Sequence, residues 1–345
     1  MTGRLRLGVI GAGWVVETCY LPHLVAGEFE VTAVVDPVAE RAGAVAARFP
    51  GTAVASGFFD TVAARCDAVL VAAPSPLHAP LVLAALEAGC HVLCEKPVAC
   101  RVEHARRLDE AARRADRVLM PACVCRHRAD ARWWLRAVAA LGPVEVVEMT
   151  WRRHDGVPMA PWHLEPSDGM TGVLADLGYH LVDLAVAAVP GTAAPAVVRA
   201  EASCRGGGGA DWYGGGGGER AYAVADDVRA EVVLATGTRL HLSVSWCDDP
   251  PGDITRLRAV GARGEAMLDG LFGFSPHRRV PYQRGVSRLD GREEHAGFVP
   301  GPALHRDGFR LLLDDFHAAC VEGRPDAAAA LEPVAAIMEA IANGV

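Results

Sequence analysis

The stretch Leu5-Arg-Leu-Gly-Val-Ile-Gly-Ala-Gly-Trp14 sets an apolar run directly before two glycines and the start of a helix. In such a turn Gly11 permits the tight bend after a strand, and Gly13 lets a pyrophosphate approach the backbone at the helix N-terminus. Asp36 ends the next apolar run, where a carboxylate accepts hydrogen bonds from an adenine ribose and repels a 2′-phosphate. The pattern predicts a dinucleotide site, with NAD expected over NADP.

The first turn of the helix completes this predicted cofactor site. Trp14 and Val15 follow the second glycine and are expected to bind the dinucleotide. Val16 stands where a third glycine or alanine usually lets the helix pack closely on the strand, so looser packing is expected there. Asp36 alone would also fit a solvated turn before Pro37, and that alternative stays open.

Apolar strands alternate with amphipathic helices to about residue 125. Parallel strands that are covered by helices on both faces are almost wholly apolar, as residues 68–73 are. The pattern predicts an α/β fold with an N-terminal Rossmann domain over residues 1–125. The expected strands are 4–10, 30–36, 68–73, 91–94 and 118–123, with helices over 77–88 and 102–115.

From residue 126 the pattern changes to long runs with strand character, joined by short turns such as Thr236-Gly237. It predicts a C-terminal α+β domain over 126–345, built on a large, mostly antiparallel open sheet. The helices of the tail, over 304–342, are expected to pack back toward the first domain. The expected strands are 144–151, 196–204, 221–236, 239–246 and 256–260, with a helix over 173–189.

Composition narrows the class of protein. The 34 basic residues are outnumbered by 42 acidic ones, a net charge of −8, which argues against a nucleic-acid surface or a polybasic membrane anchor. Apolar runs end well short of the ~18 residues of a membrane span, so a cytoplasmic protein is expected. The 10 cysteines lack metal-site spacing and are expected to be reduced, with no metal bound.

The glycine-rich stretch 206–218, with Trp212 and Tyr213, fits either a floppy hairpin loop or a mobile flap.

Lys96 is the single lysine of the chain. It lies in Glu95-Lys96-Pro97, directly after a predicted strand, at the sheet edge where open α/β folds bind ligands. Unlike arginine, lysine is a compact donor that can shift its pKa, so a catalytic role is favoured over chance survival. Asp176 and His180 stand four apart on one face of the expected helix. A histidine there can take a hydroxyl proton, and the carboxylate can orient it or bind an adjacent hydroxyl.

Four segments resemble the signatures of the Gfo/Idh/MocA family, named for glucose–fructose oxidoreductase, inositol dehydrogenase and rhizopine catabolism. They are Ala73-Pro-Ser-Pro-Leu-His78, Ala84-Ala-Leu-Glu-Ala-Gly89, His91-Val-Leu-Cys-Glu-Lys-Pro97 and Gly172-Val-Leu-Ala-Asp-Leu-Gly-Tyr-His-Leu-Val-Asp183. The resemblance implies oxidation of a secondary ring alcohol to a ketone, or the reverse reduction, and an open sheet that forms the interface of a homodimer or homotetramer. It implies that the catalytic residues are Lys96, Asp176 and His180.

The same resemblance implies further site residues. Pro74 and His78 match positions on the nicotinamide side, with Glu95 beside them. Arg126 falls where the family's substrate domain begins and is expected to contact substrate. Trp162 and His163, on the loop before the catalytic helix, are candidates for the substrate wall.

The substrate is expected to be a small polyol or amino sugar. An acidic set could pair with the amino groups of an amino sugar or aminoglycoside, or could simply be a solvated surface. The arginine- and alanine-rich composition is typical of antibiotic-producing actinomycetes, which favours an aminoglycoside-pathway sugar dehydrogenase. A redox-neutral, NAD-dependent glycoside hydrolase and a non-catalytic NAD-binding sensor are the alternatives. The acidic set is Asp155, Glu165, Asp168, Asp248, Asp249 and Asp253.

Overall fold

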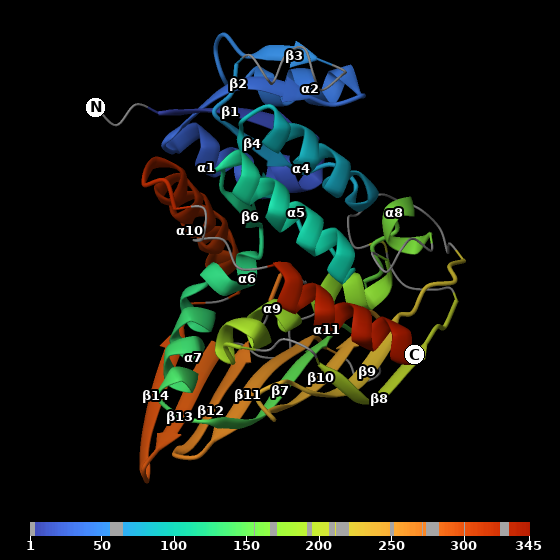
Figure 1. The fold of residues 1–345 in the computed structure, drawn as a ribbon, viewed down its shortest axis with the longest axis vertical. Helices are drawn as coiled ribbons and strands as arrows, with labels where there is room; N and C mark the ends of the chain where they lie inside the picture. Colours follow the sequence, from blue (N-terminus) through green and yellow to red (C-terminus); the bar gives the residue numbers. More distant parts are fainter. Residues whose placement is uncertain are drawn as a thin grey trace. The chain divides into compact units, whose positions relative to one another are not determined.

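The chain divides into two compact units (Figure 1). One unit comprises Met1–Ala99, Glu103–Cys123 and Phe309–Leu331, and the other comprises Cys100–Val102, Val124–Gly308 and Glu332–Val345. The computed structural model describes residues 4–55, 65–154, 156–165, 171–191, 195–206, 211, 221–248, 252–270, 272–273, 283–299, 301–324 and 331–345. Trp212, Tyr213 and most of the glycine-rich stretch lie outside these described residues.

The first unit is built on sheet A, whose six strands are all parallel and run in the order β3-β2-β1-β4-β5-β6. The strand order reverses beside β1, which is the arrangement of a dinucleotide-binding sheet. The predicted Rossmann domain is therefore confirmed, with β3 as an addition that its three residues were too few to indicate. The strands are β1 (Leu5–Ile10), β2 (Phe29–Val35), β3 (Ala53–Ala55), β4 (Ala68–Val71), β5 (His91–Cys94) and β6 (Leu119–Pro121).

Burial explains why these segments form a parallel sheet. All four residues of β4 are buried, as a strand covered on both faces requires. In α5 the buried residues Ala105, Leu108 and Ala112 recur at helical spacing, while arginines occupy the other face. The helical segments of this unit are η1 (Val16–Tyr20), α1 (Leu21–Ala26), α2 (Ala39–Ala46), η2 (Ser75–Leu77), α4 (His78–Glu87), α5 (Val102–Ala115) and the part of α10 (Gly301–Val321) from residue 309.

The second unit is built on sheet B, in the order β14-β13-β12-β11-β7-β10-β9-β8. Among the described strands of sheet B, only β10 and β7 pair in parallel, so the predicted, mostly antiparallel sheet is confirmed. The strands are β7 (Val144–Arg152), β8 (Ala196–Ser203), β9 (Asp227–Val233), β10 (Arg239–Ser245), β11 (Ile254–Gly261), β12 (Gly264–Gly270), β13 (Gln283–Leu289) and β14 (Arg292–Phe298).

Two features of this sheet differ from the expectation. The strand expected over 221–236 is β9, which is shorter because Asp226 accepts the Tyr222 hydroxyl at 2.9 Å in a loop before the strand. Strands β12, β13 and β14 were not expected at all. In β14 five of the seven residues are exposed, so it carries no alternation of apolar and polar residues to reveal a strand.

Helices cover one face of sheet B. In Figure 1 α7 (Ala129–Ala139), α9 (Tyr179–Ala188) and α11 (Leu331–Gly344) lie on the same side of it. The short segments α6 (Val124–His127), α8 (Pro161–Leu164) and η3 (Leu174–Gly178) complete the helical part. The helix expected over 173–189 therefore starts as the π-helical turn η3 and continues as α9. The tail helix α10 ends shortly before Gly323, whose φ is +61°.

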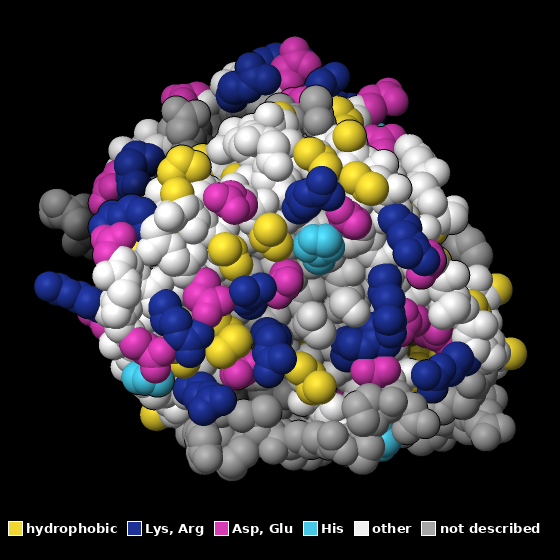
Figure 2. All heavy atoms as spheres, turned by 90° about the horizontal axis from the view of Figure 1, so that it is seen from below, with side chains coloured by type: hydrophobic (Ala, Val, Ile, Leu, Met, Phe, Trp, Pro, Cys, Tyr) yellow, Lys and Arg dark blue, Asp and Glu magenta, His cyan; other side chains and the backbone are white. Residues whose placement is uncertain are grey.

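The face of sheet B that the helices leave open is charged (Figure 2), with basic and acidic side chains interspersed. An ion-pair series crosses it from strand to strand. Arg258 on β11 pairs with Glu148 on β7 at 3.2 Å and with Glu265 on β12 at 2.9 Å. Arg288 on β13 pairs with Glu265 at 2.5 Å and with Glu293 on β14 at 2.6 Å. We call these five residues the ion-pair ladder.

Candidate active site

The carboxyl ends of the parallel strands bring the predicted cofactor residues to one edge of sheet A. Gly11 follows β1, Asp36 follows β2, Pro74 lies in the turn after β4, and Lys96 lies just after β5. The Gly11 N–H donates to the carbonyl of Val35 at 2.8 Å, which ties the first two ends together. Ligands of open α/β sheets bind at this edge.

The glycine turn fits a dinucleotide. Gly11 has φ +89°, and a Cβ there would lie 2.5 Å from the carbonyl oxygen of Ala72, so only glycine is accommodated. A Cβ on Gly13 would meet no atom within 4 Å. Gly13 is therefore not required by protein packing, and the open space beside it is where a pyrophosphate would approach the helix N-terminus.

Asp36 is only 6% exposed, so the alternative of a solvated turn is wrong. Its Oδ2 accepts the Ala12 N–H at 2.8 Å, and its Oδ1 accepts the Val38 N–H at 2.8 Å. The carboxylate thus fixes the glycine turn against the end of β2. An ionised carboxylate has about four acceptor positions, so it retains capacity for the hydroxyls of a ribose.

The helix after the glycine turn is not a regular α-helix. Trp14 and Val15 form its first turn, with the Trp14 side chain partly exposed. The π-helical turn η1 begins at Val16, which is fully buried. The widened turn starts at the position where a glycine or alanine would allow close packing on the strand, and the looser packing expected at Val16 stays a prediction.

Lys96 is held at its backbone by Glu95. The Lys96 N–H donates to Oε2 of Glu95 at 3.1 Å, and the Tyr20 hydroxyl donates to Oε1 at 2.7 Å. Burial raises the pKa of Glu95, while the two hydrogen bonds and the nearby Lys96 ammonium oppose that rise. The Lys96–Pro97 peptide bond is cis. Sequence reasoning missed Tyr20, because no local spacing links it to Glu95.

His78 is buried at the start of α4, directly after the turn that carries Pro74. Its Nδ1 lies 2.8 Å from the carbonyl oxygen of Pro97, and its Nε2 lies 2.8 Å from that of Ala73. Burial lowers the pKa of this imidazole. Because both ring nitrogens face backbone carbonyls, His78 joins the two turns beside Lys96, and its predicted contact with the nicotinamide stays a prediction.

In the second unit, Asp176 lies in η3 and His180 in α9, and both are buried. The Trp246 indole N–H donates to Asp176 Oδ2 at 2.9 Å, and the Arg153 guanidinium donates to the same oxygen at 3.4 Å. The ring of Trp151 lies 5.8 Å from that of His180. A fixed carboxylate and a buried imidazole on one helical segment are suited to general-base chemistry.

Arg153, Trp151 and Trp246 are the residues that sequence reasoning did not place in this site. Trp151 lies in β7 and Arg153 directly follows that strand, and the Arg153 guanidinium lies over the Trp151 ring, 5.6 Å from its centroid. Trp246 follows β10, the parallel neighbour of β7. In the sequence, the pair Ser245-Trp246 at the end of an expected strand was the one indication of Trp246. The register between β7 and β10 decides which carboxylate the indole reaches.

The predicted substrate residues lie in two places of this unit. Arg126 in α6 forms a two-pronged ion pair with Asp183 of α9, at 2.9 Å and 2.5 Å, one turn beyond His180. Trp162 and His163 lie together in α8, their rings 6.0 Å apart, with the Trp162 side chain partly exposed. The Arg126 guanidinium is therefore already ion-paired with the buried carboxylate of Asp183. Any contact of Arg126 with substrate would be made by this ion-paired side chain.

The described members of the acidic set differ in their environment. Asp248 pairs with Arg152 at 2.7 Å, and this guanidinium lowers the pKa of Asp248. Asp253 is fully buried and accepts the His154 N–H at 2.9 Å, while Glu165 is exposed. Asp248 and Asp253 are thus not a solvated surface. Asp155, Asp168 and Asp249 lie outside the described residues.

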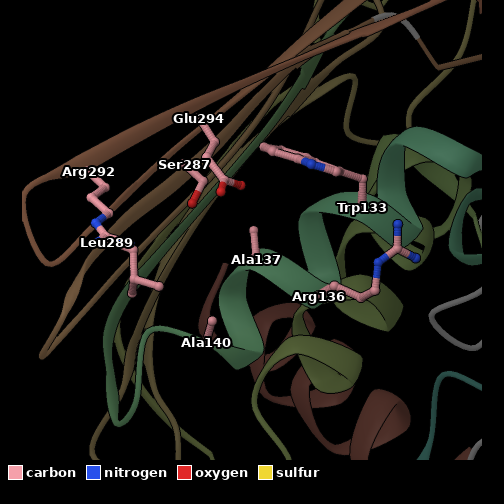
Figure 3. Close-up of a pocket in the computed structure, with 8 residues that line it drawn as sticks. All are labelled: Trp133, Arg136, Ala137, Ala140, Ser287, Leu289, Arg292 and Glu294. Atoms are coloured by element: carbon pink, nitrogen blue, oxygen red, sulfur yellow. The ribbon is translucent and has the colours of Figure 1, made fainter.

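A separate cavity of about 370 Å³ lies between α7, β13 and β14 (Figure 3). The indole of Trp133 extends from α7 toward these strands, and a Cβ on Gly285 would lie only 2.1 Å from it. Gly285 therefore makes room for Trp133. None of the site residues predicted from sequence lines this cavity.

No group of three or more His, Cys, Asp and Glu gathers at metal-binding distance in the part of the chain that the structure describes.

The ten cysteines form no disulfide, and eight of them are buried. Cys204 is exposed and Cys247 is intermediate. No helix among the described residues has the length and apolar character to span a bilayer.

Comparison with known proteins places the chain in a family. A family model described as "Oxidoreductase family, NAD-binding Rossmann fold" matches residues 5–123, and the "GFO/IDH/MocA C-terminal domain" matches residues 135–267. A protein of Amycolatopsis mediterranei, provisionally named as a UDP-kanosamine synthase oxidoreductase subunit, is 33% identical over 82% of this chain and 80% of its own length.

Two solved structures share the fold. GenD2 from gentamicin A biosynthesis, in complex with NAD, has a TM-score of 0.73 at 22% identity and covers 99% of this chain and 93% of its own. KijD10, a 3-ketoreductase from Actinomadura kijaniata in complex with NADP and TDP-benzene, has a TM-score of 0.74 at 20% identity and covers 99% and 98%. With both domain models matched and a relative this similar over most of its length, the chain belongs to the Gfo/Idh/MocA oxidoreductase family.

Proposed function

We propose that this protein is an NAD-dependent dehydrogenase that oxidises a secondary ring hydroxyl of a sugar, amino sugar or cyclitol to a ketone, or runs the reverse reduction. The observation that carries the proposal is the buried pair Asp176 and His180, with the carboxylate fixed by Arg153 and Trp246. Membership of an oxidoreductase family supplies the reaction class, action on a CH–OH group. Asp36 at the end of β2 supports NAD over NADP, because a carboxylate there repels a 2′-phosphate.

Each catalytic residue has one task in this mechanism. His180 takes the hydroxyl proton as general base, since imidazole titrates near neutral pH. Lys96 donates a hydrogen bond to the same oxygen and stabilises the negative charge that develops on it. Asp176 orients His180 or binds the neighbouring hydroxyl. A nicotinamide cofactor held at the glycine turn and Asp36 would supply the acceptor for the hydride, the carbon-bound hydrogen with its electron pair.

The names of the relatives add one candidate to the proposed substrate class. The similar protein from Amycolatopsis carries UDP in its name, and the structure of KijD10 holds a TDP compound. A nucleotide-linked hexose therefore joins neutral sugars, amino sugars, aminoglycosides and cyclitols as a candidate. The pairing of Asp248 with Arg152 weakens the argument for an amino substrate, because the guanidinium already balances the negative charge of that carboxylate.

The test is NADH formation from NAD by the purified protein with a panel that includes UDP-glucose, glucose, glucosamine, an aminoglycoside and myo-inositol. Lys96→Ala should lower kcat by a factor on the order of 100 or more and leave the Kd for NAD within about threefold. Lys96→Arg should not restore turnover, since a planar guanidinium cannot replace a point donor. Near-normal turnover by Lys96→Arg would refute the role of Lys96.

Two other results would favour the alternatives. Cleavage of a glycoside with no net gain of NADH would identify a redox-neutral hydrolase. Tight NAD binding with no turnover on any compound would indicate a sensor.

We also propose that the protein forms a homodimer or homotetramer through the open face of sheet B. Its cytoplasmic location and the lack of nucleic-acid and membrane partners stay predictions. Light scattering coupled to size-exclusion chromatography measures the oligomer directly.

A further inference from the structure

Tyr20 is a fully buried tyrosine whose hydroxyl reaches the segment of Lys96. It ends the π-helical turn η1, 75 positions before Glu95, and its hydroxyl donates to Glu95 Oε1 at 2.7 Å. Its ring packs against that of Phe309 in a T-shaped contact, with the ring centroids 5.0 Å apart. The phenol is therefore held in place at its ring, and its one polar atom is directed at Glu95.

We propose that Tyr20 is a positioning residue for Lys96: its hydroxyl fixes the Glu95 carboxylate, which in turn holds the Lys96 backbone N–H. This inference rests on the catalytic role proposed for Lys96. The two donors reach different oxygens of one carboxylate, so Glu95 forms a bridge from η1 to the residue after β5. The bridge thereby fixes the backbone at Lys96, from which the lysine side chain extends.

The two hydrogen bonds of the bridge favour ionised Glu95. A carboxylate accepts both donors, whereas a protonated carboxyl must turn one of its oxygens into a donor. Burial favours the protonated form, and the groups that oppose burial are the Tyr20 hydroxyl, the Lys96 ammonium and the Lys96 N–H. The other titratable neighbours are the thiols of Cys19 and Cys94, whose pKa values are raised by burial and by Glu95. Removing the Tyr20 hydroxyl should therefore raise the pKa of Glu95.

The experiment compares Tyr20→Phe, Glu95→Gln and the double variant in the full chain. Tyr20→Phe keeps the buried ring and removes only the hydroxyl. Thr52→Val is the matched control, because it also deletes one side-chain hydrogen bond of this unit, from Thr52 Oγ1 to the Val31 carbonyl at 2.7 Å. Infrared spectroscopy of the cofactor-free protein follows the protonated carboxyl band that Glu95→Gln lacks. Thermal unfolding confirms that each variant is folded.

We expect this band to titrate about one pH unit higher in Tyr20→Phe than in the wild type or Thr52→Val. On a substrate found in the panel, kcat of Tyr20→Phe should fall on the order of tenfold, with its acid limb shifted in the same direction. In Glu95→Gln, which cannot titrate, adding Tyr20→Phe should change kcat by less than about twofold, since the two residues act as one unit.

An unshifted carboxyl band in folded Tyr20→Phe would overturn the bridge. A shifted band with unchanged kcat and pH profile would overturn its role in positioning Lys96, as would additive losses in the double variant. The infrared titration needs no substrate. If no compound in the panel is turned over, a shifted band still supports the bridge while the proposed dehydrogenase function fails, so the two failures are distinguishable.

Discussion

The side chain of His91 makes the stability of the fold depend on pH. It begins β5 and accepts the Val118 N–H through Nδ1 at 3.0 Å, which requires the neutral ring. Burial and the Arg117 guanidinium lower its pKa below 6.5, against the opposing carboxylates of Asp67 and Asp116. The unfolded chain therefore takes up this proton at a higher pH than the folded protein. Its contribution to stability is complete above pH 6.5 and is lost as the pH falls from 6.5 through the lower folded pKa.

His91→Asn should remove that dependence. The asparagine amide oxygen can accept the Val118 N–H at any pH, so the variant should be about as stable as the wild type near pH 7.5. Between about pH 6.5 and pH 5.5 its free energy of unfolding should fall less steeply, as measured by urea denaturation at several pH values. His295→Gln, an exposed histidine on β14, serves as the control. Equal slopes for His91→Asn and wild type would contradict the prediction.

The sequence predicts the chemical role of a single residue better than it predicts which residues that side chain contacts. Lys96 and His180 stand out because few side chains can donate to or deprotonate a hydroxyl near neutral pH. The groups that fix the site come from distant segments: Trp246 lies 70 positions from Asp176, and Tyr20 lies 75 from Glu95. Spacing along one helix indicates which residues share a face, but only the packing of separate elements decides what that face meets.

The turn between β1 and its helix offers a matched pair of glycines. Gly11→Ala should destabilise the fold, because φ is +89° and the new Cβ would lie 2.5 Å from the Ala72 carbonyl oxygen. Gly13→Ala should leave the cofactor-free protein as stable as the wild type or slightly more so, since its Cβ would meet nothing within 4 Å. That Cβ would occupy the side on which a pyrophosphate approaches, so NAD binding should weaken at least about tenfold.

Thermal unfolding without cofactor and fluorescence titration with NADH separate the two effects. We expect Gly11→Ala to lose several degrees in Tm, and Gly13→Ala to lose affinity with an unchanged Tm. Unchanged affinity in Gly13→Ala would place the cofactor elsewhere than at this turn.

Helices and strands could be predicted where burial of one face makes apolar residues recur at a regular spacing. The all-buried β4 and the amphipathic α5 follow the patterns expected of a covered sheet and its helices. Strands β13 and β14 were missed because β14 is mostly exposed, and in β13 the buried run Gly285–Ser287 holds a single apolar side chain, Val286, between two exposed arginines. The π-helical turns η1 and η3 were also missed, because a widened turn depends on packing around it and not on local periodicity.

At the scale of the whole molecule, the open face of sheet B is the surface on which assembly depends in our proposal. Isolated surface ion pairs contribute little to stability, at about 0–1 kcal/mol each. The ion-pair ladder is different in extent, because it joins β7, β11, β12, β13 and β14 through alternating charges. Like charges across an interface cost several kcal/mol, so an assembly through this face should be sensitive to one reversed charge in the ladder.

Arg258→Glu tests the proposal, because it would place a third carboxylate between Glu148 and Glu265. Light scattering should then show monomers where the wild type is a dimer or tetramer. Arg310→Glu is the control for charge: it reverses the same charge in the exposed pair of Arg310 with Asp314 on α10 and should leave the oligomer intact. Within the separated monomer, Arg258→Glu should cost only about 1 kcal/mol, since Arg258 is partly solvated. A wild type that is monomeric, or an oligomer that survives Arg258→Glu as it survives Arg310→Glu, would remove this face from the assembly and leave the ladder as a surface network of one subunit.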